Sequence, residues 1–260
     1  MPKFAVVLLF LFFSCHLQAQ TWEVGGTLGG AGYIGDLNPD NPVKVSGAMG
    51  GLFVKRNFDG YLSAKLNFAF SKISAADANS SSQQFRNRNL SFKDPMKEIS
   101  LTGEFNFMKY IPDAGPNRYT PYIYSGIGLT AYTPRADYKG KTYSLRNLRT
   151  EAQPTRYGKT TVVIPYGVGL KYNFSGKWTA GGDIGYRYTF TDYLDDVSGV
   201  YADKRMIPNA VPRSLSDRSP EIGLPANPAG SQRGDFKPRD TYFFIGLSIS
   251  FTFVTQNCYY

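Results

Sequence analysis

Apolar and polar residues alternate with a period of two along several segments of this 260-residue chain. In the clearest segment, 242–253, every odd-numbered position is apolar, whereas Ser248, Ser250 and Thr252 are even-numbered. Only a β-strand places alternate side chains on opposite faces. The pattern predicts further strands at 62–71, 98–107, 162–172 and 178–190, and in a less regular, glycine-rich form at 22–35, 45–57 and 121–132. The chain is therefore predicted to be all-β, with eight strands.

The links between these strands alternate between short and long. Short links are predicted at 57–60, 111–120 and 175–177, and long links at 36–44, 74–95, 134–160 and 193–240. Outer-membrane barrels have short periplasmic turns and long outward loops. The sequence thus favours an eight-stranded antiparallel outer-membrane β-barrel with both termini at the short-turn end. Side chains fill the interior of a barrel of this size.

Alternation alone leaves open which face points outward, because a soluble lipocalin-like barrel would give the same pattern. Two observations favour the membrane barrel. Aromatic residues gather near the strand ends, as an interfacial girdle requires. The polar face combines small polar residues with a few charges that could neutralise one another inside a lumen. The expected lumen charges are Glu23, Lys65, Glu98, Glu104, Lys171, Asp183 and Arg187.

The N-terminus has the features of a cleaved signal peptide. Lys3 precedes the apolar run 4–13, and small and polar residues follow up to Ala19. The run is too short to span a bilayer as a helix. We therefore expect cleavage after residue 19, export to the outer membrane of a Gram-negative bacterium, and a single barrel domain over 20–260. In an alternative interpretation Cys15 is a lipid-modified cysteine, although Phe12 and Phe13 fit such a site poorly.

The expected mature chain has one cysteine, Cys258, and no histidine, because His16 is the only histidine of the chain. A Ser-His-Asp or Cys-His catalytic arrangement and a histidine-ligated metal site are thereby excluded. We expect no enzymatic activity and no cofactor. The role of Cys258 stays open.

The densest acidic cluster is formed by Asp192, Asp195 and Asp196. Their carboxylate oxygens could hold Ca²⁺, although the spacing matches no EF-hand. They could also contact a partner, or anchor a loop by accepting backbone N–H and tyrosine O–H hydrogen bonds, and loop anchoring is the favoured interpretation. A formal dinucleotide-binding pattern at 30–35 is followed by a turn-forming segment where that motif needs a helix, so we assign it no function.

The net charge of +9 is concentrated in the segment 135–159. Seven basic residues there face only Asp137 and Glu151. On an outer surface this loop would meet lipopolysaccharide phosphates or an acidic partner, or it is simply solvated. No nucleic-acid-binding motif accompanies the charge, so nucleic acid is not an expected partner. The loop 203–240 is rich in proline and glycine and is expected to be mobile or ordered by a partner.

Four stretches resemble the PorG-like outer-membrane β-barrel family. They are 32–38 (GYIGDLN), 120–128, 164–172 (IPYGVGLKY) and, as the most specific, 185–201 (GYRYTFTDYLDDVSGVY). Within them the candidates for structural or partner contacts are Asp36, Arg187, Asp192, Tyr193, Asp195 and Asp196.

The resemblance implies a non-enzymatic component of the type IX protein secretion system. Such a component would dock or stabilise a periplasmic lipoprotein ring and its partner at the outer membrane, near the translocon. Its contact surface would lie on the short turns or on the tail 254–260, whereas strand counting puts the Asp-rich run at the outward end, unless the topology is inverted. The alternative is a stand-alone barrel that binds a lipid or another hydrophobic ligand, or a surface adhesin.

Overall fold

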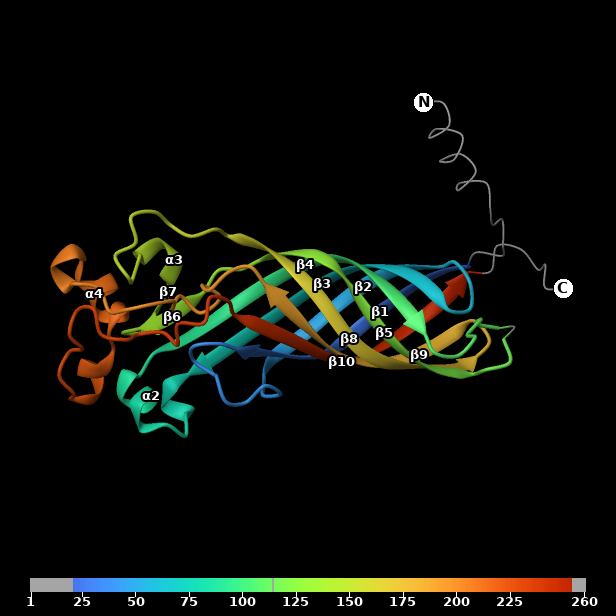
Figure 1. Cartoon of the computed structure of the whole chain (residues 1–260), viewed down its shortest axis with the longest axis horizontal. Helices are drawn as coiled ribbons and strands as arrows, with labels where there is room; N and C mark the ends of the chain where they lie inside the picture. The colour runs from blue at the N-terminus through green and yellow to red at the C-terminus, as the bar shows by residue number, and fades with distance from the viewer. Residues whose placement is uncertain (1–20, 114, 254–260) are drawn as a thin grey trace, which may run out of the picture.

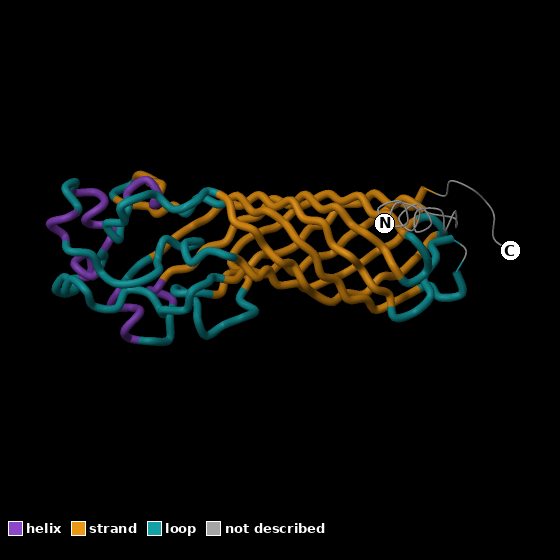
Figure 2. Tube along the Cα trace, turned by 45° about the horizontal axis from the view of Figure 1, so that its top comes forward, coloured by secondary structure: helices purple, strands orange, loops and turns teal. Residues whose placement is uncertain are grey.

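In the computed structural model, which describes residues 21–113 and 115–253, eight long strands close into an antiparallel barrel (Figures 1 and 2). They are β1 (Thr21–Ile34), β2 (Val45–Asn57), β3 (Leu62–Ala76), β4 (Ser91–Asn106), β5 (Tyr119–Ala131), β8 (Thr160–Ser175), β9 (Trp178–Thr189) and β10 (Thr241–Phe253). Each pairs with its neighbours in the chain, and β1 pairs with β10 to complete the ring. The predicted all-β, eight-stranded outer-membrane barrel fold is confirmed.

Apolar side chains cover the outside of the barrel. Leu28 of β1 and Leu247 of β10 face each other across the closing strand pair, and each is 74% exposed. Their inward-facing neighbours are small or polar, which is the arrangement of a barrel surrounded by lipid. Among the described residues, no helix is long and apolar enough to span a membrane.

Short turns join the strands at one end. They cover 58–61, 107–118 and 176–177. In the first turn the Asp59 carboxylate accepts hydrogen bonds from the backbone N–H groups of Tyr61 and Leu62, at 2.6 and 2.8 Å. In the last turn Gly176 has a φ of +46°, a conformation that suits glycine. We call this the turn end.

Long loops form a folded cap at the other end (Figure 2). The cap comprises 35–44, 77–90, 132–159 and 190–240. It contains η1 (Asp77–Asn79), α2 (Gln83–Arg88), β6 (Arg135–Tyr138), β7 (Lys141–Ser144), α3 (Leu145–Leu148), η2 (Lys204–Met206), α4 (Ala210–Ser216) and η3 (Ser219–Ile222). The loop 203–240 thus carries three short helices and buried residues. Its mobility stays a prediction.

The predicted link 74–95 was too long, because β3 and β4 continue pairing up to Ala76 and Ser91. In this extension the lipid-facing pattern is reversed. Phe92 and Met96 are buried inside, whereas Lys93 and Lys97 are exposed outside. A search for apolar residues on the outward face therefore missed it. The hydrophobic core lies at this cap end, where Tyr33, Phe92 and Phe244 belong to the same buried cluster.

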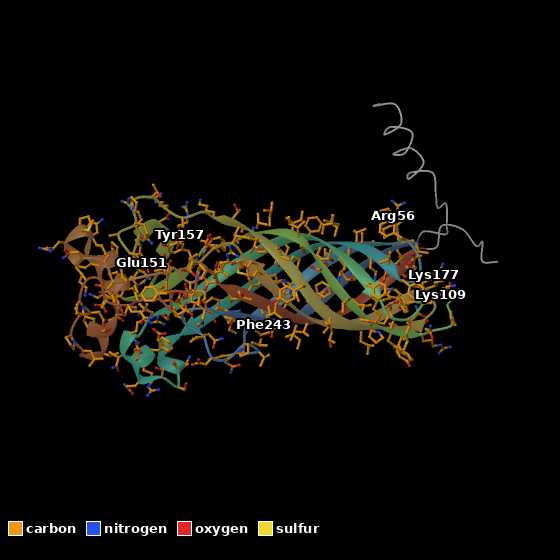
Figure 3. The ribbon with its side chains drawn as sticks, in the orientation of Figure 1. Arg56, Lys109, Glu151, Tyr157, Lys177 and Phe243 are labelled. Carbon is orange, nitrogen blue, oxygen red and sulfur yellow. The ribbon has the colours of Figure 1, made fainter. Side chains whose placement is uncertain are left out.

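Phe243 departs from the simple alternation. It belongs to the apolar, outward face of β10, yet it is only 1% exposed. The ring of Tyr186 lies 5.6 Å from its ring, and the Tyr186 hydroxyl donates a hydrogen bond to the carbonyl of Pro42. The loop 35–44 thus lies against the barrel wall near Phe243 (Figure 3).

Replacing Leu247 by arginine should cost about 2 to 4 kcal/mol of folding free energy and impair insertion, because a charge near the bilayer midplane must leave water. Ser248→Ala, on the opposite face of the same strand, should be nearly silent. Urea unfolding in lipid vesicles would measure both. Equal damage from the two substitutions would contradict the face assignment.

Candidate functional site

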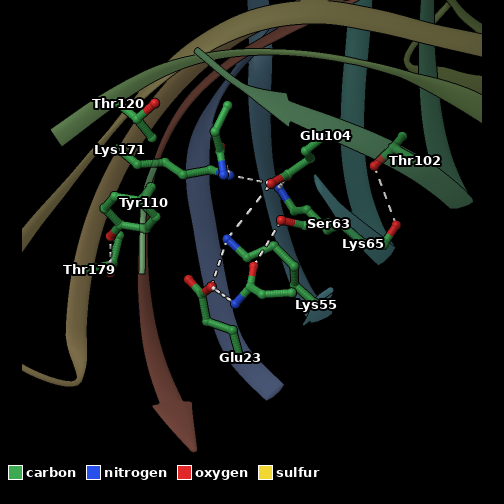
Figure 4. Close-up of polar contacts among 12 residues, drawn as sticks. Glu23, Lys55, Ser63, Lys65, Thr102, Glu104, Tyr110, Thr120, Lys171 and Thr179 are labelled. Atoms are coloured by element: carbon green, nitrogen blue, oxygen red, sulfur yellow. Dashed lines mark hydrogen bonds and ion pairs between the residues drawn. The ribbon is translucent and has the colours of Figure 1, made fainter. Parts of the chain in front are cut away.

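Ion pairs fill the lumen near the turn end (Figure 4). The Lys171 ammonium lies 2.6 Å from a carboxylate oxygen of Glu104, and Lys55 bridges Glu104 at 3.8 Å and Glu23 at 2.8 Å. Lys65 lies 3.7 Å from the other oxygen of Glu104. All these side chains are largely buried, so opposite charges offset one another where water is scarce.

A second group of charges fills the lumen closer to the cap. Arg187 lies 3.2 Å from the Glu98 carboxylate, which also accepts a hydrogen bond of 2.8 Å from the Tyr242 hydroxyl. The Tyr124 hydroxyl donates to Asp183 at 3.0 Å. The structure therefore places in the lumen the set expected from the sequence, namely Glu23, Lys65, Glu98, Glu104, Lys171, Asp183 and Arg187.

Lys55 was missed by the sequence analysis, although it is the cation closest to Glu23. It lies in the glycine-rich strand β2, where weak alternation did not reveal which positions point inward. A lumen cavity between the two groups, lined by described residues of both, measures about 40 Å³. A space of this size holds a few water molecules at most. The lumen is thus filled, as expected for eight strands.

The cap contains a buried acidic cluster, which consists of Tyr33, Asp36, Asp195 and Asp240. The hydroxyl of Tyr33 lies 2.5 Å from an Asp195 oxygen and 3.0 Å from an Asp240 oxygen. Carboxylate oxygens of the three aspartates lie within 4.8 Å of one another. Backbone N–H groups contribute as well, because Leu194 donates to Asp240 and Val197 donates to Asp195.

The three carboxylates of this cluster favour the protonated form. Burial raises the pKa of Asp36 to about 7. Burial and the neighbouring carboxylates raise the pKa of Asp195 and of Asp240 well above the usual range. Chemically, the carboxylate oxygens of the cluster can share protons. Alternatively, these hard oxygen ligands can hold a cation in place of the protons.

The Asp-rich run does not form one shared site. Asp195 points to the acidic cluster, whereas Asp196 accepts hydrogen bonds from Thr150 at 2.5 Å and Tyr157 at 2.6 Å. Asp192 is half-buried, and burial raises its pKa to about 6. The calcium site considered for Asp192, Asp195 and Asp196 is therefore not assembled. Anchoring of the loop by tyrosine O–H and backbone N–H donors is what the geometry shows.

Aromatic stacking fixes this part of the cap. The ring of Tyr157 lies between those of Tyr132 and Tyr193, at centroid distances of 6.3 and 4.5 Å. The partner candidate Tyr193 is thus one face of a stack inside the cap. The basic segment 135–159 contributes to the same region, since Arg146 donates to the carbonyl of Tyr157 at 2.6 Å.

Asp240, Asp77 and two arginines were not recognised from the sequence. Arg88 forms a two-point contact with Asp77, in which both distances are 2.7 Å, and Arg233 lies 2.7 Å from Glu151. These residues lie in irregular loops, where no periodicity indicates burial. Only the position of Asp240, directly before the last strand, could have drawn attention to it.

The model of one protein family matches residues 2–206 of the chain, which is well over half of its length. The chain belongs to the family described as Domain of unknown function (DUF6089). The match includes all strands except β10, so this DUF6089 chain adds its closing strand and most of the β9–β10 loop beyond the matched region. A comparison with curated proteins found no match.

Solved structures similar to this DUF6089 chain are bacterial outer-membrane proteins. The N-terminal β-barrel domain of Pseudomonas aeruginosa OprF is 11% identical, with a TM-score of 0.41, and the alignment covers 90% of this chain and 97% of that one. A major outer membrane protein from Thermus thermophilus is 14% identical, with a TM-score of 0.44 and coverages of 91% and 100%. Neisserial surface protein A is 8% identical, with a TM-score of 0.42 and coverages of 91% and 98%.

The substitution Lys55→Met should cost about 3 to 5 kcal/mol of unfolding free energy, because it leaves Glu23 buried without its closest cation. The double variant Glu23→Gln/Lys55→Met should recover much of this loss, since it removes both charges. Urea unfolding of the two variants in lipid vesicles tests the expectation. A double variant that is less stable than the single variant would show that the pair is not the dominant interaction.

The cap should be more stable in mild acid than in mild base. The unfolded cap has aspartates with ordinary pKa values, whereas the folded cluster binds protons more tightly. The resulting stabilisation is therefore complete below about pH 4 and is lost as pH rises through the Asp36 pKa of about 7. Hydrogen exchange of the Leu194 and Val197 amides at about pH 5 and about pH 8, corrected for intrinsic rates and with a chelator present, should show lower protection at the higher pH.

Asp240→Asn provides the control for this pH dependence. It removes one titrating group and keeps a hydrogen-bond acceptor for the Leu194 amide. The variant should flatten the pH dependence of protection. An unchanged pH profile in this variant would rule out the cluster as its source.

Proposed function

We propose that this DUF6089 chain is a non-enzymatic outer-membrane component of the type IX protein secretion system. It would dock or stabilise the periplasmic lipoprotein ring and its partner near the translocon. The observation that carries the proposal is the filled lumen, because a barrel that cannot pass a solute must act through its two ends. Export through a signal peptide at 1–19 belongs to the proposal, and that segment lies outside the described residues.

The resemblance to the PorG-like family supplies the secretion system. Two of the stretches that carry it meet in space, since Asp36 comes from 32–38 and Asp195 from 185–201 and both belong to the acidic cluster. In this proposal these stretches build the cap. The contact surface for the periplasmic ring is therefore sought at the opposite end.

The turn end carries exposed basic side chains around the barrel rim. Lys109 and Lys177 lie there, opposite the cap residues Glu151 and Tyr157 (Figure 3), and Arg118 is exposed in the same turns. The acidic residues of these turns are Asp59 and Asp113, and Asp59 is engaged in its own turn. A basic rim of this kind suits an acidic surface on a periplasmic partner. Cys258 and the tail 254–260 lie outside the described residues.

The double charge reversal Lys109→Glu/Lys177→Glu should greatly reduce recovery of the periplasmic ring proteins. The measurement is a mild-detergent pull-down from outer membranes, with a tag inserted between the exposed residues Pro225 and Ala226, followed by mass spectrometry. The matched control is Lys139→Glu/Lys141→Glu, which makes the same charge change in the β6–β7 hairpin of the cap.

Ring recovery that falls only in the turn-end variant would support docking at the periplasmic rim. Recovery of the unmodified barrel alone, in a detergent that preserves known complexes, would refute the docking role. If ring recovery fell equally in both variants, the loss would not be specific to the rim, which would contradict docking there.

The second candidate is a stand-alone outer-membrane barrel that binds a ligand or acts as a surface adhesin. The observation that favours it is the size of the folded cap, which presents helices and loops away from the membrane (Figure 1). Outer-membrane lipid and lipopolysaccharide would be its nearest partners. Purification of the barrel without ring proteins but with a bound lipid would favour this candidate.

A further inference from the structure

A cleft of about 420 Å³ opens in the cap, between α2 and the β9–β10 loop. It has the size of a small-molecule site. Amide side chains from both segments line it together with the ring of Phe85, and the lining contains no carboxylate. The amide residues are Gln84, Asn87, Asn227 and Gln232.

Two buried residues of the cleft have hydrogen-bond donors left over. Arg233 is 3% exposed; its Nε donates to the Ser216 carbonyl, and its Nη1 donates to Glu151 and to the Asp196 carbonyl. Within the part of the chain that the structure describes, its Nη2 group makes no hydrogen bond, and neither does the hydroxyl of the buried Tyr201. Neither group is among the buried polar atoms that lack a partner in the described part of the chain, so both are open to the cleft and can donate to an acceptor there.

The positive charges of the cleft are held in place before any ligand arrives. Arg88 is fixed by both oxygens of Asp77 and by the carbonyls of Asp36 and Arg233. Its guanidinium also lies 4.7 Å from the ring centre of Phe85. Such fixed guanidinium groups lose little conformational freedom on binding.

We propose that this cleft binds a saccharide that carries a carboxylate or phosphate group. The Nη2 group of Arg233 and the one remaining N–H of Arg88 Nη1 can donate to such an anion. The amides of Gln84 and Asn87 provide donors for sugar hydroxyls, and the amide oxygens of Asn227 and Gln232, whose NH2 groups donate within the loop, provide acceptors. Phe85 provides an apolar face for a sugar ring. Because the cleft lies at the opposite end from the basic rim, this binding is independent of the proposed docking role.

The test is a calorimetric titration of the purified mature barrel in detergent micelles with D-glucuronate and with D-glucose. Saturable binding is expected for glucuronate, with binding at least about tenfold weaker for glucose, since only the former offers a charge to the guanidinium groups. Glucose 1-phosphate as a third probe separates phosphate from carboxylate recognition.

A pair of charge variants on one helix provides the control. Gln84→Glu places a carboxylate in the cleft and should weaken glucuronate binding by about tenfold, because like charges at this range repel. Gln83→Glu makes the same change one residue away, at an exposed position outside the lining, and should leave the affinity unchanged. Both positions are exposed, so the fold should tolerate either variant.

Three results would overturn the proposal: no saturable binding of either acidic probe, equal affinity for glucose and glucuronate, or equal affinity in the two variants. A second experiment distinguishes a lipid-attached saccharide from a free one. Lipopolysaccharide in reconstituted vesicles is compared with the soluble polysaccharide released from it, and tighter binding of one form identifies whether the natural ligand is attached to lipid or free.

Discussion

The carboxylate of Glu104, shared among buried lysines, is the interaction on which the rest of the barrel depends. It meets Lys171 from β8 and Lys55 from β2, so a single side chain of β4 connects three strands through the lumen. Strand pairing alone would hold the wall, but a polar interior needs its charges compensated where water is scarce. The compensated charges occupy much of the lumen near the turn end.

The polarity of the inner and outer faces of the barrel wall changes along the barrel axis. At the level of Leu28 and Leu247 the wall is apolar outside and polar inside. At the level of Phe92 and Met96 the order is reversed, because the outside of the wall there is polar and the inside is closed by the hydrophobic core. The barrel is therefore a membrane protein over part of its length and resembles a water-soluble barrel over the rest.

This change of surroundings explains what could be predicted from the sequence. Strands such as 242–253 were recognised because their apolar faces point consistently to lipid, and the charges on their other faces were placed in the lumen for the same reason. The extension of β3 and β4 and the inward position of Lys55 were missed, because their patterns are reversed or diluted by glycine. The acidic cluster could not be derived, since Tyr33, Asp36, Asp195 and Asp240 come from three separate segments that meet only after folding.

The position of Asp240 also bears on the order of assembly. It precedes the first residue of β10, while Tyr33 is next to the last residue of β1, and the seam of the barrel is formed by these two strands, from Trp22 opposite Phe253 to Ile34 opposite Thr241. Joining the seam brings Asp240 to the Tyr33 hydroxyl. The acidic cluster therefore cannot be complete until β10 has paired with β1. A complete cluster thus indicates that the barrel has closed.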